Sequence, residues 1–107
     1  MNRGERFQSL LDEVHGIYKS RRLAIIQRTY PPMRFESAAH AVATGPALPD
    51  YAGVLWDGRY VCVEAKFFPT LRSRTYKHRL HQFRYLVEVD ELTAGRAVTG
   101  YIAMWEN

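Results

Sequence analysis

Two β-like runs that meet at a short turn constrain the fold of this chain more than any other part of it. Residues 49–67 read PDYAGVLWDGRYVCVEAKF, and the dipeptide Asp57-Gly58 separates the two runs. Asp-Gly favours the positive φ angles of a two-residue hairpin turn. Residues at i and i+2 of a strand point to the same face, so Glu64 and Lys66 project together while the valines and alanine between and before them turn into a core. The stretch therefore predicts a β-hairpin that carries a carboxylate and an ammonium group side by side.

Helices are predicted on both sides of this hairpin. A first amphipathic helix is expected over residues 5–19 and a second over residues 76–92, because apolar residues recur there at helical spacing. Packing in a core accounts for the apolar residues of the first helix, which are Phe7, Leu10, Leu11, Val14, Ile17 and Tyr18. The apolar face of the second helix consists of Leu80, Phe83, Leu86 and Val87.

Two further strands complete the expected elements. Residues 23–27, LAIIQ, predict a first strand, and residues 98–105 predict a last strand that is buried on both sides at Ile102 and Met104. Residues 35–49 contain alanines that permit a helix, but their glycine and prolines predict a loop. The fold class is α/β, a mixed central β-sheet flanked by helices.

Size and composition bound the possible functions. A chain of 107 residues with 47% hydrophobic and 24% charged residues is expected to form one soluble globular domain, residues 1–107. No apolar run reaches the roughly 18 residues that a membrane span needs, and the polar start MNRGERF differs from a secretory signal. A single cysteine, Cys62, excludes a disulfide framework within the chain. We expect an intracellular protein with no membrane partner.

Charge is distributed unevenly along the chain. The net charge is +4, and residues 65–87 contain six lysines and arginines but no aspartate or glutamate. Such a stretch suits a polyanion, because each neutralised phosphate releases counterions. A solvated basic face is the alternative interpretation, and the neighbouring carboxylate pair favours nucleic acid.

The hairpin residues could form a small metal site. Magnesium takes oxygen ligands and keeps several waters, so the carboxylates of Asp50 and Glu64 and the backbone carbonyl of Ala65 would suffice to hold it. Lys66 would lie beside the metal and stabilise negative charge while a phosphodiester is hydrolysed. The same residues could instead form an exposed hairpin edge whose Glu and Lys provide solubility.

At this point the motifs resemble a known family. Pro49-Asp50 followed by Glu64-Ala65-Lys66 resembles the signature of the PD-(D/E)xK nuclease superfamily. The similarity extends to the RecU-type and archaeal-type Holliday junction resolvases, through NRG at residues 2–4, DYAGV at 50–54, VEAKF at 63–67 and HQ at 81–82. The resemblance implies a restriction-endonuclease-like core. It also implies that Asp50 and Glu64 are metal ligands and that Lys66 is the catalytic lysine.

The resemblance leaves several roles open. Gln82 would match a glutamine near the active site of these nucleases, or it is a polar residue on a helix surface. The family usually carries an acidic residue where this chain has Gln8, so Glu5, one turn earlier on the same side, is the preferred substitute over Glu13. Glu5 could instead complement the dipole at the helix N-terminus. The segment between the first strand and Asp50 is too short for the full stalk of RecU-type enzymes.

Together these interpretations predict a magnesium-dependent endonuclease, with manganese as a possible substitute and no small-molecule cofactor. Its substrate would be branched DNA, a four-way junction cut by paired nicks, which requires a two-fold symmetric homodimer. The cytoplasm of a bacterial, archaeal or phage-infected cell is the expected location. Other nucleases of the superfamily, acting on nicks, flaps or linear duplex, and a non-catalytic DNA-binding protein are the alternatives. Phosphate contacts are expected from Arg3, Arg28, Arg34, Arg72, Arg74, Lys77 and Arg79.

Overall fold

The structure is a computed structural model that describes residues 2–29, 33–37, 40–43, 49–68 and 80–105, with side chains for 2–29, 49–68 and 83–104. Its elements in chain order are α1 (Arg3–Ser20), β1 (Ala24–Arg28), β2 (Met33–Ser37), β3 (His40–Ala43), β4 (Tyr51–Leu55), β5 (Tyr60–Phe68), α2 (Leu80–Leu92) and β6 (Val98–Trp105). Neither of these two helices is long and apolar enough to cross a membrane.

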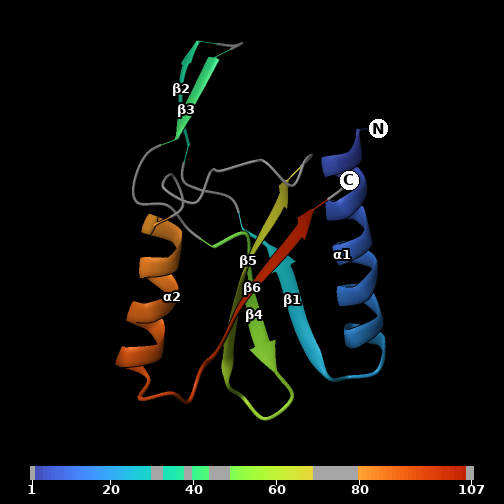
Figure 1. The fold of residues 1–107 in the computed structure, drawn as a ribbon, viewed down its shortest axis with the longest axis vertical. Coiled ribbons are helices and arrows are strands. Elements are labelled where there is room, and N and C mark those ends of the chain that lie inside the picture. The colour runs from blue at the N-terminus through green and yellow to red at the C-terminus, as the bar shows by residue number, and fades with distance from the viewer. Residues whose placement is uncertain (1, 30–32, 38–39, 44–48, 69–79, 106–107) are drawn as a thin grey trace.

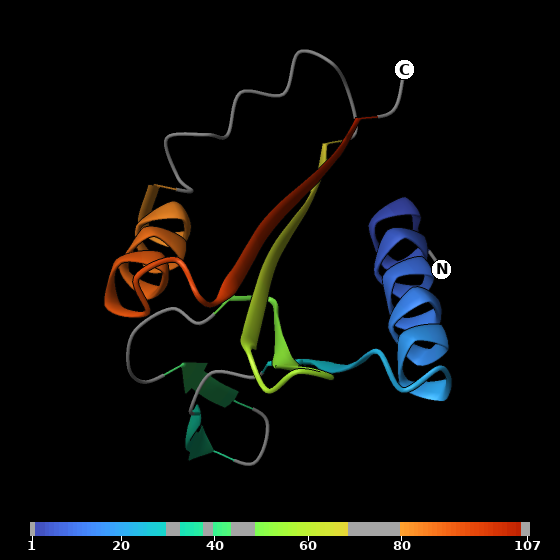
Figure 2. The same cartoon turned by 90° about the horizontal axis from the view of Figure 1, so that it is seen from below.

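The larger sheet has four strands in the order β1-β4-β5-β6. Its β1–β4 and β4–β5 pairs are antiparallel, whereas β5 and β6 are parallel and are connected through α2. The two helices lie on opposite sides of this sheet, α1 against β1 and α2 against β6 (Figures 1 and 2). The predicted fold class, an α/β domain with a mixed sheet and flanking helices, is confirmed.

The core lies between α1 and the sheet. Phe7 and Leu11 of α1 pack with Tyr51 of β4, and partly buried side chains of β1 and β5 surround them. The inward-facing residues of β5 include Val63 and Ala65, as the alternation of the strand predicts. Burial of a large apolar side chain contributes about 1.5–3 kcal/mol, so these few residues fix α1 on the sheet.

Parts of the apolar patterns were interpreted wrongly. Leu10 and Ile17 of α1 are 50% and 51% exposed, because the sheet covers only the face of the helix that carries Phe7 and Leu11. In the same way, α2 buries Leu86 but leaves Val87 53% exposed. Helical spacing identifies the apolar face of a helix, but it does not show how many residues of that face the sheet will bury.

The last strand has the predicted bounds but not the predicted burial. Ile102 and Met104 are 38% and 42% exposed. The cause is the position of β6 at an edge of the sheet, while α1 packs at the opposite edge against β1. A continuous apolar run therefore marks an edge strand here and not a central one.

Two strands form where a loop was predicted. β2 and β3 pair antiparallel as a separate two-stranded sheet, with a register shift between Phe35 and Ser37. This hairpin projects beyond the larger sheet at the end where α1 begins (Figure 1). Gly45, Pro46 and the Pro31-Pro32 pair lie outside the described residues, and in the sequence they fall before and after the two strands.

The β4–β5 turn has three residues instead of two. Leu55 and Arg59 close the loop through a hydrogen bond from the Leu55 N–H to the Arg59 carbonyl, 2.9 Å. Gly58 takes the positive φ of 88°, whereas the Asp57 carboxylate accepts a bond from the Arg59 N–H at 3.2 Å. The Asp-Gly pair predicted the hairpin correctly, but only the glycine adopts the left-handed conformation.

Candidate active site

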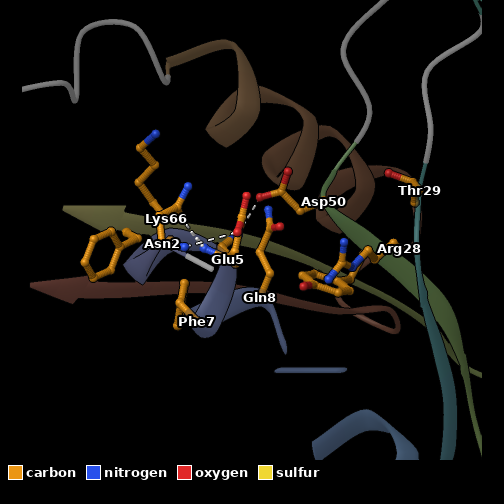
Figure 3. Close-up of a pocket in the computed structure, with 12 residues that line it drawn as sticks. Asn2, Glu5, Phe7, Gln8, Arg28, Thr29, Asp50 and Lys66 are labelled. Carbon is orange, nitrogen blue, oxygen red and sulfur yellow. Dashed lines mark hydrogen bonds between the residues drawn. The ribbon is translucent and has the colours of Figure 1, made fainter. Parts of the chain in front are cut away.

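A pocket of about 550 Å³ opens at the end of the sheet where α1 begins. Its walls come from the first two turns of α1, the end of β1, the start of β4 and the second half of β5 (Figure 3). Charged or polar side chains reach it from each of these elements, among them Glu5, Arg28, Asp50 and Lys66. The pocket thus combines carboxylates with cations, as a phosphate-processing site requires.

Asp50 is held rigidly at the entrance to β4. Its Oδ2 accepts a hydrogen bond from the backbone N–H of Ala65 at 2.9 Å. Its backbone carbonyl accepts a bond from the Thr29 N–H at 2.9 Å, and the Thr29 hydroxyl donates to the carbonyl of Pro49. Thr29, which directly follows β1, therefore holds the Pro49-Asp50 dipeptide, while β5 holds the Asp50 carboxylate. Most of the acceptor capacity of a carboxylate remains after one such bond.

On β5 the two residues of the predicted pair lie at different depths. Lys66 lines the pocket together with Ala65. Glu64 is only 1% exposed and is not among the residues that line the pocket. The β4–β5 register pairs Tyr51 with Val63, so one further step along the ladder places Asp50 beside Glu64. The structure thus brings Asp50 and Lys66 to one cavity, with the Glu64 carboxylate buried next to them.

Of the two candidate acidic residues on the first helix, Glu5 is the one that lies on its pocket side. Glu5 and Gln8 line the pocket, whereas Glu13 is exposed and lies outside its lining. Glu5 also forms a capping box with Asn2: the Glu5 N–H donates to Asn2 Oδ1 at 2.8 Å, and the Asn2 N–H donates to Glu5 Oε2 at 3.1 Å. Both proposed roles of Glu5, a site carboxylate and an N-terminal helix residue, are therefore compatible with its position.

Arg28 closes the opposite wall of the pocket. Asp12 of α1 binds its guanidinium in a two-pronged pair, with Nε to Oδ1 at 3.1 Å and Nη2 to Oδ2 at 2.5 Å. Tyr51 lies beside this pair, and burial raises the pKa of its hydroxyl, aided by the charges of Asp12 and Asp50 and opposed by Arg28. Such bidentate pairing restricts the orientation of the guanidinium, and Arg28 is also one of the residues that line the pocket.

A buried histidine packs against Tyr51, which lines the pocket next to Arg28. His15 is 8% exposed, and its ring meets the ring of Tyr51 edge-on, with centroids 4.8 Å apart. Burial lowers the pKa of His15, and the Asp12 carboxylate partly opposes that effect. The neutral ring packs as part of the core and holds Tyr51 in place.

The donor set fits a hard divalent cation. Two carboxylates and one backbone carbonyl, from Asp50, Glu64 and Ala65, are the oxygen ligands that magnesium accepts with waters completing its shell. A buried carboxyl group such as that of Glu64 needs hydrogen bonds, and compensating charge where it is ionised, which protein groups or a cation can supply. In the described part of the chain, no three side chains of His, Cys, Asp or Glu gather closely enough to hold a metal ion by themselves. Any metal here would rely on few protein ligands.

The other predicted contact residues are only partly described. Arg3 lies exposed in the first turn of α1, and Arg34 and Gln82 lie on β2 and α2, where only the backbone is described. The remaining four, Arg72, Arg74, Lys77 and Arg79, lie outside the described residues.

Some residues of the site had escaped the sequence interpretation. Asn2 is one of them, although together with the predicted residue Glu5 it forms an N-x-x-E pattern, which is a recognisable helix start. Asp12, His15 and Thr29 gave no such signal, because their partners lie 16, 36 and 20 residues away in the chain. Contacts of that separation depend on the fold.

No model of a known protein family matches the chain, and no curated protein matches its sequence.

Proposed function

We propose that this chain is a magnesium-dependent endonuclease that resolves four-way DNA junctions with paired nicks, built on a restriction-endonuclease-like core. The observation that carries the proposal is the pocket that Asp50, anchored to the N–H of Ala65, lines together with Lys66. The buried carboxylate of Glu64 lies next to them on β5. The four-stranded mixed sheet with a helix on each side is compatible with such a core.

The residues of the pocket have complementary tasks in phosphodiester hydrolysis. Asp50, Glu64 and the Ala65 carbonyl would hold magnesium, which would supply charge neutralisation and a bound water of lowered pKa. The Lys66 ammonium, which lines the pocket, would donate to a phosphate oxygen and stabilise the charge that develops on it. Arg28, oriented by Asp12, would bind a phosphate at the opposite wall.

The position of the β2–β3 hairpin supports a branched substrate. It is inserted between β1 and Asp50, where the resemblance to RecU-type enzymes places a stalk, and it projects at the pocket end of the sheet (Figure 1). Two copies of the chain in a symmetric dimer would present two pockets, as paired nicks require.

Cleavage of a synthetic four-way junction in magnesium tests the proposal. We expect symmetric nicks, little cutting of the matching linear duplex, and no activity after chelation. Glu64→Ala should abolish cleavage and leave junction binding within about threefold, because it removes a charge that repels phosphate. Equal cutting of linear duplex would contradict the resolvase assignment and favour another nuclease of the superfamily.

A second candidate is a non-catalytic DNA-binding protein on the same fold. It is favoured by the burial of Glu64 and by the engagement of the Glu5 carboxylate in a capping box. Junction binding without cleavage in magnesium or manganese would support it.

A further inference from the structure

An apolar groove lies at the end of the sheet away from the pocket. It has a volume of about 470 Å³ and is lined by Lys19, Ser20, Arg22, Ala24, Ile25, Val54, Leu55 and Trp56. Trp56 directly follows β4 and Asp50 directly precedes it. At about 3.4 Å per residue the two residues are about 20 Å apart, so a ligand in this groove does not reach the pocket.

The floor of the groove consists of cross-strand neighbours. The register of β1 and β4 pairs Ile25 with Val54, and the Trp56 N–H donates to the Leu23 carbonyl at 2.9 Å, which continues the pairing. Because side chains alternate along a strand, Ile25, Val54 and Trp56 share one face, opposite to that of the core residues Ile26 and Tyr51.

These side chains are unusually exposed for their size. Trp56 is 75% exposed, and Leu23, Ile25 and Val54 are 45%, 47% and 42% exposed. Neither of the two described helices covers them, since α1 packs on the other face of β1 and α2 packs against β6. A contiguous exposed group of a tryptophan and three aliphatic residues is typical of a protein-binding surface.

The charged side chains around the apolar floor of the groove are positive. Among the described residues, Lys19 and Arg22 line the groove and no acidic side chain does. Asp57, the nearest acidic residue in sequence, pairs with Arg59 at 2.7 Å and lies outside the lining. A cationic rim around an apolar floor complements a ligand with large apolar side chains flanked by carboxylates.

We propose that this groove binds a short peptide segment of a partner protein in which apolar residues are flanked by Asp or Glu. The aliphatic floor favours a peptide over nucleic acid, because phosphates and sugars gain nothing from contact with Ile25 and Val54. Trp56 is the anchor, and Lys19 and Arg22 contact the flanking carboxylates. This inference is independent of the proposed nuclease activity, since none of its residues lines the pocket at Asp50.

A labelled synthetic peptide with two leucines and a phenylalanine between glutamates is a suitable probe for the full chain. In a Trp105→Phe background, we expect saturable binding with a blue shift of the Trp56 fluorescence. Trp56→Ala should weaken binding about tenfold or more, as for a tryptophan anchor. The double variant K19E/R22E, or lysines in place of the glutamates of the peptide, should weaken it by a similar factor.

Leu92→Ala is the matched control, because Leu92 is 87% exposed and lies outside the groove lining. It should leave peptide binding unchanged, and thermal unfolding should show that every variant is folded. Absence of saturable binding, or equal binding by Trp56→Ala, would overturn the proposal. So would a loss of junction affinity or of self-association in Trp56→Ala, because the groove would then serve DNA or a second copy of the chain.

Discussion

At the scale of single residues, burial shifts the pKa values of side chains in and next to the candidate site. His15 is the clearest example, because it packs against Tyr51, which borders the pocket, and burial lowers its pKa. In the unfolded chain its pKa returns to about 6.5. The unfolded state therefore binds more protons below that pH, and the contribution of neutral His15 to stability is lost as the pH falls.

We predict that the free energy of unfolding decreases from pH 7.5 to pH 5 more steeply in the natural protein than in His15→Phe. Phenylalanine keeps an aromatic ring against Tyr51 but does not titrate. Urea unfolding at several pH values measures the difference. Equal slopes for the two proteins would show that His15 does not carry this pH dependence.

The two glutamates of the first helix allow a matched comparison. Glu5 lines the pocket and Glu13 does not. Glu5→Gln keeps a side-chain oxygen for the capping box, so its thermal stability should change by less than about 1 kcal/mol. If the Glu5 carboxylate assists metal binding, Glu5→Gln requires several-fold more magnesium for half-maximal cleavage, whereas Glu13→Gln does not. A titration of cleavage against magnesium concentration distinguishes the two outcomes.

At the scale of elements, the close approach of β1 and β4 depends on a missing side chain. A Cβ atom on Gly53 would lie 1.7 Å from the backbone carbonyl oxygen of Ile25. The added Cβ is bonded directly to the β4 backbone, and the atom that it meets belongs to the β1 backbone. The clash can therefore be relieved only if the two strands move apart, which would break the β1–β4 hydrogen bonds next to Asp50. The glycine of the DYAGV motif is thus required by packing, whatever the protein does.

We predict that Gly53→Ala destabilises the protein by about 3 kcal/mol, at the upper end of the range for overpacking. Gly16→Ala is the control: a Cβ there meets nothing within 4 Å, and alanine is the better helix former. It should stabilise the protein by about 0.5–1 kcal/mol. Chemical denaturation measures both changes, and tolerance of Gly53→Ala would mean that the two strands separate more easily than their register implies.

The sequence predicted the elements that depend on local signals better than the features that depend on contacts between residues far apart in the chain. The β4–β5 hairpin and the bounds of β6 were predicted correctly, because alternation and turn residues are local signals. The β2–β3 hairpin was missed, since glycine and prolines nearby suggested a loop. The motif predicted that Asp50, Glu64 and Lys66 come together; the structure places Asp50 and Lys66 in the pocket lining, whereas Glu64 is buried outside it. Depth depends on neighbouring strands and helices, which the residue pattern does not specify.

At the scale of the whole molecule, the two candidate binding regions lie at opposite ends of the four-stranded sheet. The β2–β3 hairpin projects at the end where α1 and β4 begin (Figure 1). The pocket at Asp50 lies at that end, because Asp50 directly precedes β4, and the groove at Trp56 lies at the other end, because Trp56 directly follows β4. The net charge of +4 favours DNA in general, so charge alone does not distinguish the two ends. The salt dependence of DNA binding in variants with altered charge distinguishes the two ends.

We predict that replacing Arg72, Arg74, Lys77 and Arg79 with glutamine lowers junction affinity and reduces the slope of log K against log salt. Removing one side chain that neutralises a phosphate reduces that slope by about 0.9, so removing four would reduce it by about 3.6. The double variant K19Q/R22Q also removes positive charge, but from the end away from the pocket, and its slope should change by less than about 0.9. Fluorescence anisotropy with a labelled junction at several salt concentrations measures all three proteins. An equal slope change per charge removed in K19Q/R22Q would mean that DNA also contacts the end of the molecule that carries the groove, and the assignment of the groove to a peptide would then fail.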